Sequence, residues 1–394
     1  MMMKALITAA GLLVLAGCAT APVAPVATLP ADQLWRDQEF GYTEAPIPVG
    51  TPELFALAAD LLSALQASGV KGASTQKRVD HLIDLLFGPD LKPFPYASDL
   101  SFTAAETWRS KRGNCLSLSV LAYSVAKALD LPVQLQEVRV AQFFDRHGSV
   151  DFVGRHVNVL IRNDARLHLR TGVIAAGDVV IDFEPRSGWL RAGTALSEEG
   201  VLARYYNNIA ADHFAQGNLT RAYAWFKAAI VADPQYSSSY GNLAQLYRRK
   251  GFTDSAERLL LHAIALSEVD DTPVHSLHQL LVAQGRDAEA AKYAAILKAR
   301  QEKNPYYWLG VGLDYLREAK YSRAVSALER AEALTSGFDE VHRYLAIAYW
   351  RNGDQARANK QLEVLASLLP AGTARTNDAG YAALSRKLRN PPDN

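Results

Sequence analysis

Three residues of this 394-residue chain, Cys115, His156 and Asp182, have the types and the order that nucleophilic catalysis by a thiol requires. A thiolate attacks an electrophile, a neighbouring imidazole moves the proton, and a carboxylate holds the imidazole in one tautomer. We therefore expect a relay in which Asp182 orients His156 and His156 exchanges a proton with Cys115. The surrounding sequence must then fold so that the three side chains meet.

Cys115 follows the segment Arg112-Gly113-Asn114 and opens an apolar stretch that ends before Pro132. Asn114 is a good N-cap and Pro132 stops a helix, so we expect a largely buried helix with Cys115 in its first turn. There the helix dipole favours a thiolate, and unpaired backbone N–H groups can stabilise an oxyanion. A lone cysteine is often an inert core residue, but a core cysteine would need no Gly-Asn turn before it.

His156 and Asp182 fall on two expected strands, residues 155–161 and 178–183. In each strand the apolar residues alternate on one face, and His156 or Asp182 lies on the opposite face. If residues 163–177 turn the chain back, the two strands pair in antiparallel orientation and both side chains point toward the helix start.

The sequence leaves alternatives for two of these roles. His147 and His168 are other candidates for the base, although neither begins a strand of comparable alternation. Asp178 lies on the same expected face as Asp182 and is its main rival.

The residues that precede Cys115 predict the helical part of the same domain. Segments 52–66 and 75–87 carry apolar residues at helical spacing, with Gly and Pro breaks between them. We interpret Trp108 as a core or lid residue. Helices followed by strands predict an α+β domain.

An Arg-Gly-Asn-Cys helix start, a strand that begins with His and a strand that carries Asp before Pro185 together resemble the core of the transglutaminase-like family, which has a papain-related fold. The motif covers residues 104–185, with 41 residues from Cys to His and 26 from His to Asp. The resemblance implies a cysteine protease, an amidase or a transglutaminase-type acyltransferase. Such an enzyme forms a thioester from an amide and passes the acyl group to water or to an amine.

The chain departs from that family at two points. The family often places an aromatic residue shortly after the His, where this chain has Asn158, and the upstream oxyanion donor has no assigned counterpart. No calcium-loop pattern or metal cluster occurs, so we expect no metal and no cofactor. His275 and His278 lie one turn apart, but no third metal ligand is near them in the sequence.

A period of 34 residues runs through the C-terminal half of the chain. One marker ends the first helix of each copy, at Gly217, Gly251, Gly285, Ala319 and Gly353. A small residue follows in each copy, at Ala222, Ala256, Ala290, Ala324 and Ala358. The pattern resembles the tetratricopeptide repeat and implies an all-α solenoid of five repeats over residues 203–372. The third copy has His278 at a usual small position and Ala294 at a usual bulky one, so we expect a distortion there.

Solenoids of this kind bind an extended peptide or a partner domain in a concave groove. The family's groove positions fall on Asn207, Gln245, Arg248, Arg249, Arg317, Arg343 and Arg351. Guanidinium groups pair with carboxylates, so an acidic segment or a C-terminal carboxylate is the expected ligand. A solvated helix face is the alternative interpretation.

Residues 1–18 predict an export signal, because Lys4 precedes an apolar stretch that is too short to span a bilayer. The segment Leu15-Ala16-Gly17-Cys18 resembles the lipobox of bacterial lipoproteins, which implies that Cys18 carries lipid such as palmitate. Ala19 resembles the residue that directs lipoproteins to the outer membrane, facing the periplasm. An ordinary secretory signal is the alternative.

Residues 19–50 are rich in Pro and Ala and predict an extended tether, and residues 373–394 form a C-terminal tail. The chain has two cysteines, so lipid on Cys18 would leave Cys115 as the sole free thiol. A net charge of +1 without a basic run argues against nucleic acid as a partner. Contact with a membrane is expected through the lipid anchor alone.

We therefore expect an α+β papain-like, transglutaminase-like domain over residues 51–200, followed by the all-α tetratricopeptide solenoid. The favoured function is an envelope-anchored thiol enzyme that acts on protein or peptide substrates, with the repeats recruiting a substrate or partner protein. A non-catalytic periplasmic scaffold that binds proteins through the repeat groove is the alternative.

Overall fold

The computed structural model describes residues 29–43, 47, 49–88, 94–95, 97, 101–138, 144–147, 150–153, 156–162, 166–168, 174–176, 178–183, 193–267, 270–334 and 339–368. The expected signal over 1–18, Cys18 itself and the tail over 373–394 lie outside the described residues. No helix among the described residues has the length and apolar content needed to cross a membrane.

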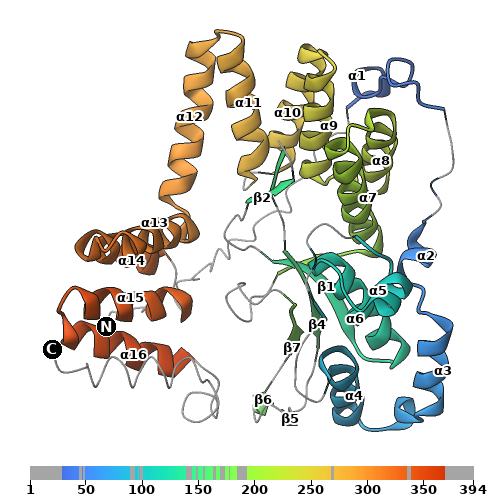
Figure 1. Cartoon of the computed structure of the whole chain (residues 1–394), viewed down its shortest axis with the longest axis vertical. Coiled ribbons are helices and arrows are strands. Elements are labelled where there is room, and N and C mark those ends of the chain that lie inside the picture. The colour runs from blue at the N-terminus through green and yellow to red at the C-terminus, as the bar shows by residue number, and fades with distance from the viewer. Residues whose placement is uncertain are drawn as a thin grey trace, which may run out of the picture.

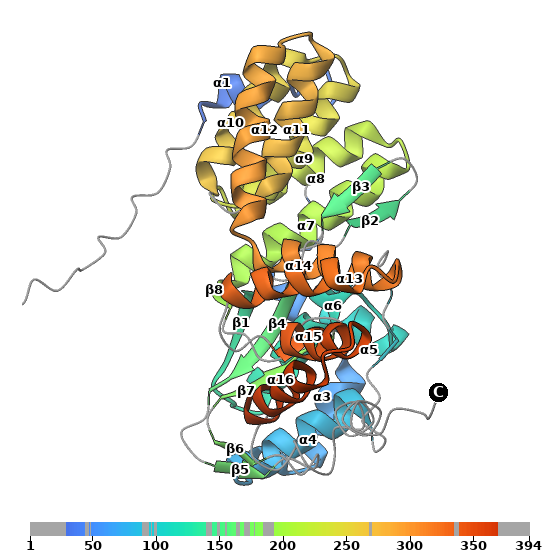
Figure 2. The ribbon, with the colours of Figure 1, turned by 90° about the vertical axis from the view of Figure 1, so that its left-hand side faces the viewer.

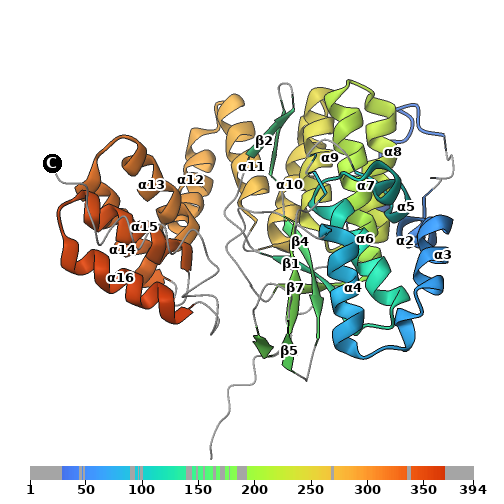
Figure 3. The same cartoon turned by 60° about the horizontal axis from the view of Figure 1, so that its bottom comes forward.

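The N-terminal half packs helices against a small antiparallel sheet. Its helices are α2 (Thr51–Phe55), α3 (Ala59–Ala67), η1 (Val70–Gly72), α4 (Thr75–Phe87), α5 (Ala104–Ser110) and α6 (Cys115–Ala128). The sheet has the order β7-β4-β1-β8, formed by β7 (Val179–Ile181), β4 (His156–Ile161), β1 (Val133–Val138) and β8 (Thr194–Leu196). Two separate hairpins pair β2 (Phe144–His147) with β3 (Val150–Val153), and β5 (Arg166–His168) with β6 (Ile174–Ala176). Figures 1 and 3 show α4 and α6 on the same side of the sheet.

The predicted pairing of the His and Asp strands is confirmed. Strands β4 and β7 are antiparallel neighbours, with Val159 opposite Ile181 and Ile161 opposite Val179. One expected helix was wrong. Segment 52–66 forms two helices, α2 and α3, which are separated by extended backbone at Ala56 and Ala58.

Helix α6 is the central element of the N-terminal core. Its Leu118, Leu121 and Val125 are fully or almost fully buried, and they pack with residues of α4, β1 and β4 in one apolar cluster. The hydroxyl of Ser119 donates a hydrogen bond of 2.8 Å to the carbonyl oxygen of Val157, which fixes α6 directly to β4. The helix ends at Ala128, earlier than the end expected just before Pro132. It stops there because Asp130 adopts a left-handed conformation with φ of 52°.

Five helical hairpins follow, and Figure 1 shows them in succession from α7 to α16. They are α7 (Glu198–Ala215) with α8 (Leu219–Ala232), α9 (Ser237–Arg249) with α10 (Thr253–Leu266), α11 (Asp271–Ala283) with α12 (Asp287–Glu302), α13 (Pro305–Arg317) with α14 (Tyr321–Leu334), and α15 (Asp339–Arg351) with α16 (Gln355–Leu368). The marker residue after each first helix has a positive φ, as a helix C-terminus requires. The helical-repeat prediction is therefore confirmed.

The expected distortion in the third repeat is present. Ala290 is the buried residue of α12, and the other side chains of that helix are exposed or partly exposed. One apolar cluster ends at Ala290, and a second begins at Leu309 in α13. The small Ala294 stands where the other repeats have a bulky anchor, so α12 lacks the side chain that would join the two cores. Figure 2 shows α13 and α14 running across the direction of α12.

The boundary between the two expected domains is not a linker. Helix α7 begins at Glu198, capped by Ser197, and its first half packs in the core of the α/β part, whereas Ala210 and Phe214 belong to the core of the repeats. Arg204 is 8% exposed and donates from Nε to Glu137 of β1 at 2.9 Å. The two halves of the chain therefore share one helix.

Part of the expected tether is also docked. We expected residues 19–50 to hold the folded body away from an anchor, but the short helix α1 (Ala31–Leu34) and the residues after it pack on the repeats. Leu34 and Phe40 are buried in the core of the first two repeats. Apolar and aromatic side chains at these positions overrode the extended tendency of the Pro-rich tract.

We predict that Ala319→Gly stabilises the protein. Ala319 has φ of 55°, whereas the equivalent residues of the other repeats are glycines with φ between 71° and 84°. Relief of this left-handed strain should raise the free energy of unfolding by roughly 1 kcal/mol. The matched control, Gly285→Ala, should lower it by about the same amount, because a Cβ there meets nothing within 4 Å and only the backbone conformation is penalised. Urea unfolding followed by circular dichroism measures both changes. Equal unfolding midpoints in the wild type and Ala319→Gly would refute the claim that Ala319 is strained.

Candidate active site

The start of α6 is built by Gly113 and Asn114. The Oδ1 atom of Asn114 accepts a hydrogen bond of 2.9 Å from the backbone N–H of Ser117, which is the expected N-cap. Its Nδ2 atom donates to Ser101 at 2.8 Å, so the cap is itself held in place. A Cβ at position 113 would lie 2.8 Å from the Cβ of Ser117, so only glycine allows this close turn. These contacts fix Cys115 as the first residue of the helix.

His156 and Asp182 meet at the edge between β4 and β7. The imidazole Nε2 atom lies 2.7 Å from Oδ1 of Asp182, and the His156 side chain is completely buried. Since a carboxylate accepts hydrogen bonds, Nε2 carries a proton and donates a hydrogen bond to Asp182. Asp182 thus fixes Nε2 as the protonated nitrogen of the neutral imidazole. Nδ1 is then the ring nitrogen that does not contact the carboxylate.

The thiol of Cys115 interacts with the same imidazole. The Nδ1 atom of His156 is buried and makes no hydrogen bond to a described residue. The structure therefore brings Cys115, His156 and Asp182 together around one imidazole, with the carboxylate on Nε2. Cys115 is 9% exposed and the Asp182 side chain is 25% exposed, so the site lies just below the surface.

The electrostatics favour a charged imidazole. Burial by itself lowers the pKa of His156, but the hydrogen bond to Asp182, the hydrogen bond with Cys115 and the negative charges on both partners outweigh burial and raise this pKa to about 10. The imidazole of His156 is therefore charged at neutral pH. This arrangement is the one that a nucleophilic thiolate requires.

Asn158 is a member of the site that the sequence did not identify as functional. Its Nδ2 atom donates to Oδ2 of Asp182 at 3.1 Å, while His156 occupies Oδ1. Asn158 is 1% exposed, and its Oδ1 atom has no partner among the described residues. The available signal was its position two residues after His156, which puts both side chains on one face of β4.

The alternative candidates for the carboxylate and the base are not part of the His156–Asp182 contact. Asp178 lies 3.6 Å from the guanidinium of Arg162, and both side chains are largely exposed. His147 belongs to β2 and His168 to β5, and neither strand is part of the sheet that carries His156. Trp108 donates from Nε1 to Asp60 at 3.0 Å and lies under the ammonium group of Lys111.

The seven expected groove residues are spread along the first helices of the repeats. Asn207 is 6% exposed and accepts a hydrogen bond of 2.9 Å from Asn242, so it braces α7 against α9 and does not present a free side chain. Arg248 pairs with Gln245 at 3.0 Å, and Arg249 lies over the ring of Phe214. The other three are on the last two hairpins: Arg317 pairs with Asp314, Arg343 is partly exposed, and Arg351 lies over Trp350.

The residues that the structure describes include no group of three or more His, Cys, Asp or Glu side chains suited to a metal ion. The rings of His275 and His278 are 6.5 Å apart, and they belong to no such group.

We predict that His156 stays protonated at neutral pH and titrates near pH 10. Its pKa in the folded state, about 10, lies above the ordinary value of 6.5. Protonation of His156 therefore contributes stability that is fully present below about pH 6.5 and is lost as the pH rises toward 10. Asp182→Asn removes a partner that raises this pKa, so the imidazole should titrate at a lower pH. The matched control Asp178→Asn should leave the titration unchanged. An NMR titration of the imidazole in the three proteins measures this, and an unaltered midpoint in Asp182→Asn would refute the coupling.

Comparison with known proteins bears on the repeats. The tetratricopeptide repeat family model matches residues 202–231 and 237–269, which lie in the hairpins from α7 to α10. A curated relative, the human cilia- and flagella-associated protein 70, is 24% identical over 172 residues. The match covers 43% of this chain and 15% of that protein, so the chain spans a small part of its length.

Solved structures that are similar to part of the chain include MamA, pilF and YrrB. MamA is 19% identical, with coverage of 43% of this chain and 92% of MamA and a TM-score of 0.24. The pilF protein of Pseudomonas aeruginosa is 16% identical, with coverage of 50% and 96% and a TM-score of 0.26. YrrB, described as a TPR protein with an unusual peptide-binding site, is 17% identical, with coverage of 47% and 92% and a TM-score of 0.24. From the family match and its own helical hairpins, the chain carries tetratricopeptide repeats, which are modules for protein–protein interaction.

Proposed function

We propose that the chain is a thiol enzyme that cleaves or transfers an amide acyl group of protein or peptide substrates. The observation that carries the proposal is that His156, held by Asp182 at 2.7 Å, also interacts with Cys115 at the start of a buried helix. A structural cysteine needs neither an oriented imidazole nor a carboxylate behind it.

The reaction follows from the charges at the site. The thiolate of Cys115 forms a bond to the carbonyl carbon of the amide, and the carbonyl oxygen becomes an oxyanion next to the first N–H groups of α6, which have no partner within the helix. The imidazolium of His156 gives its proton to the amine nitrogen as the C–N bond breaks, which leaves a thioester. Water or an amine then loses a proton to His156 and displaces the thiolate. Asp182 keeps the imidazole in the required tautomer throughout.

The fold of residues 51–200 is proposed to be transglutaminase-like, within the papain-related group. In support, the cysteine begins a buried helix, the histidine begins β4, and the aspartate follows β7 in an antiparallel sheet packed on that helix. The order of the three residues along the chain is also that of the family resemblance. The repeats would then recruit the substrate or a partner protein to the enzyme, as interaction modules do.

We further propose that Cys18 is lipid-modified and anchors the chain to the outer membrane of a bacterial envelope, with the folded part in the periplasm. The support is the sequence Leu15-Ala16-Gly17-Cys18 after a short apolar stretch.

The second candidate function is a scaffold that binds proteins through its repeats and does no chemistry. Two observations favour it: the family match covers the repeats alone, and the Cys115 side chain is largely buried. In that case the contacts of His156 and Asp182 would serve only to satisfy buried polar groups.

We predict that iodoacetamide labels Cys115 at neutral pH on the order of tenfold or more faster than it labels free cysteine, since the thiolate is paired with an imidazolium. His156→Ala should remove this excess rate, and Asp182→Asn should reduce it. His168→Ala is the matched control and should label at the wild-type rate. Mass spectrometry of the alkylated peptide provides the rates.

The same variants separate the two functions. For an enzyme, an electrophilic peptide library should label the intact chain and not Cys115→Ala, and Cys115→Ala should reproduce the null phenotype in cells. A silent Cys115→Ala, together with a strong effect of disrupting the repeats, would favour the scaffold. Equal alkylation rates in wild type and His156→Ala would remove the basis of the catalytic proposal.

The lipid anchor has a direct test because the chain has two cysteines. Growth of the expressing bacterium with an alkyne analogue of palmitate should label the wild-type protein and Cys115→Ser, but not Cys18→Ser. Gel fluorescence after coupling of a dye to the alkyne measures the label. Labelling that persists in Cys18→Ser would exclude this residue as the lipid attachment point.

A further inference from the structure

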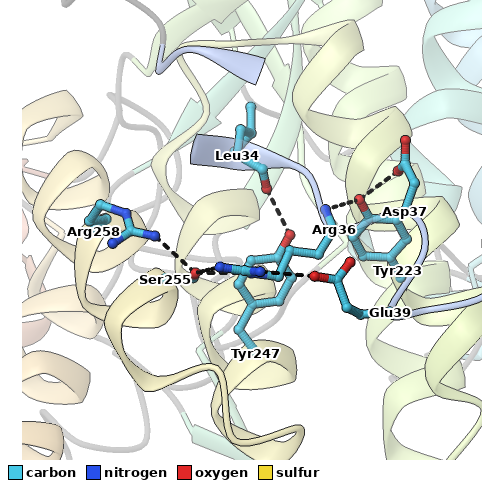
Figure 4. Close-up of polar contacts among 8 residues, drawn as sticks. All are labelled: Leu34, Arg36, Asp37, Glu39, Tyr223, Tyr247, Ser255 and Arg258. Atoms are coloured by element: carbon cyan, nitrogen blue, oxygen red, sulfur yellow. Dashed lines mark hydrogen bonds and ion pairs between the residues drawn. The ribbon is translucent and has the colours of Figure 1, made fainter. Parts of the chain in front are cut away.

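A segment near the N-terminus is held on the first two repeats by a dense set of specific contacts. This segment, residues 34–42, is called the strap here. It follows α1 and lies against α8, the end of α9 and the start of α10 (Figure 4). Its partners are about 180 to 220 residues away in the sequence, so local folding does not explain its position.

Charged side chains of the strap are matched individually by the repeats. Asp37 accepts a hydrogen bond of 2.7 Å from the hydroxyl of Tyr223, and the ammonium group of Lys227 lies 2.9 Å from both of its carboxylate oxygens. These contacts lower the pKa of Asp37 in spite of its partial burial, which raises it, so the carboxylate stays charged. The guanidinium of Arg36 donates twice to the hydroxyl of Ser255, at 3.0 and 2.7 Å.

An aromatic side chain anchors the strap between these polar contacts. Phe40 is 3% exposed, and its ring stacks on Tyr223 with centroids 4.5 Å apart and nearly parallel planes. It also stacks on Tyr247 at 5.6 Å and meets Phe252 edge-on at 6.1 Å. The three rings form a pocket for one aromatic side chain.

The backbone of the strap is bound as well. Tyr223 accepts a hydrogen bond of 2.8 Å from the N–H of Arg36, and Tyr247 donates to the carbonyl oxygen of Leu34 at 2.7 Å. Thr220 donates to the carbonyl oxygen of Phe40 at 2.8 Å. Main-chain hydrogen bonds combined with a side-chain pocket and ion pairs are how proteins recognise short peptides.

We propose that α8, the end of α9 and the start of α10 form a peptide-binding site, and that its ligand is this chain's own strap. The site selects an arginine followed by an aspartate, with an aromatic residue three positions after the aspartate. Its residues lie on α8, at the end of α9 and at the start of α10, and none of them is one of the seven expected groove residues. The repeats thus hold an intramolecular ligand through residues other than the expected groove residues.

The position of the strap also determines which repeats would lie near a lipid anchor at Cys18. Cys18 lies twelve positions before Pro30, where the docked region begins. A chain of that length spans at most about 40 Å, so an anchor at Cys18 would keep the first two repeats near the membrane. This consequence depends on the lipid anchor proposed above, whereas the peptide-binding site does not.

The test converts the strap into a separable ligand. A protease-recognition sequence is inserted after Thr43 of the full chain, the folded protein is cleaved without denaturant, and size-exclusion chromatography shows whether the N-terminal fragment stays bound. We expect retention, and we expect an excess of a synthetic peptide of residues 30–43 to exchange with the fragment.

Phe40→Ala should weaken peptide binding on the order of a hundredfold, because it empties the aromatic pocket. Tyr223→Phe in the repeats should weaken binding roughly tenfold, because it removes one hydroxyl that contacts both Asp37 and the backbone.

Gln38→Ala in the peptide is the matched control, because the side chain of Gln38 is exposed within the strap. It should bind as the wild-type peptide does. Release of the wild-type fragment from a remainder that keeps its helical circular dichroism would overturn the proposal, and so would equal weakening by Gln38→Ala and Phe40→Ala. Light scattering of the uncleaved chain should show a monomer, whereas dimers that exchange straps would refute binding within one chain. None of these measurements depends on Cys115 or Cys18, so a failure here leaves the enzyme and anchor proposals intact.

Discussion

The buried ion pair between Arg204 and Glu137 joins the repeats to the sheet that carries the candidate site. Arg204 lies on α7 and Glu137 on β1, and both side chains are largely shielded from water. A second acceptor, the carbonyl oxygen of Gly200, lies 2.8 Å from Nη1, and the ring of Tyr236 covers the guanidinium at 4.1 Å. Removing one partner of such a pair leaves a charge without compensation, which typically costs about 3–5 kcal/mol. The contact therefore holds α7 in one register against β1.

The position of α7 against β1 affects the candidate site through the pairing of strands in the sheet. Glu137 is adjacent to Val138, and Val138 pairs with His156 across the β1–β4 ladder. A second connection joins α7 to the helix that carries the thiol, because Glu198 accepts hydrogen bonds from Tyr123 and Lys127 of α6 at 2.9 and 2.6 Å. The Lys127 contact is half exposed and weak by itself, but the Tyr123 contact is partly buried. One repeat helix thus contacts α6, which presents the thiol, and β1, the neighbour of the strand that presents the imidazole.

The sequence predicted features that depend on neighbouring residues and missed those that depend on distant ones. The N-cap at Asn114 and the left-handed residue after each first repeat helix were predictable, because caps and left-handed turns are decided within a few residues. The alternation around His156 and Asp182 was sufficient to predict their pairing. Asn158 was missed as a partner of Asp182, because its role depends on which oxygen of the carboxylate His156 leaves free. The docked strap was missed because Phe40 and Tyr223 have no sequence relation that a local pattern could reveal.

The repeats have two separate apolar cores, and this division affects how a bound protein would be positioned relative to the candidate site. Repeats that share a core with α7 keep a fixed relation to β1 and α6, and the first two repeats do so through Ala210 and Phe214. The fourth and fifth repeats have a separate core that begins at Leu309, beyond the weakly packed α12. A protein bound to the first two repeats would therefore be placed at a defined distance from Cys115. A protein bound to the last two would be placed through α12 and its junction with α13, and Ala290 is the one buried residue described in α12.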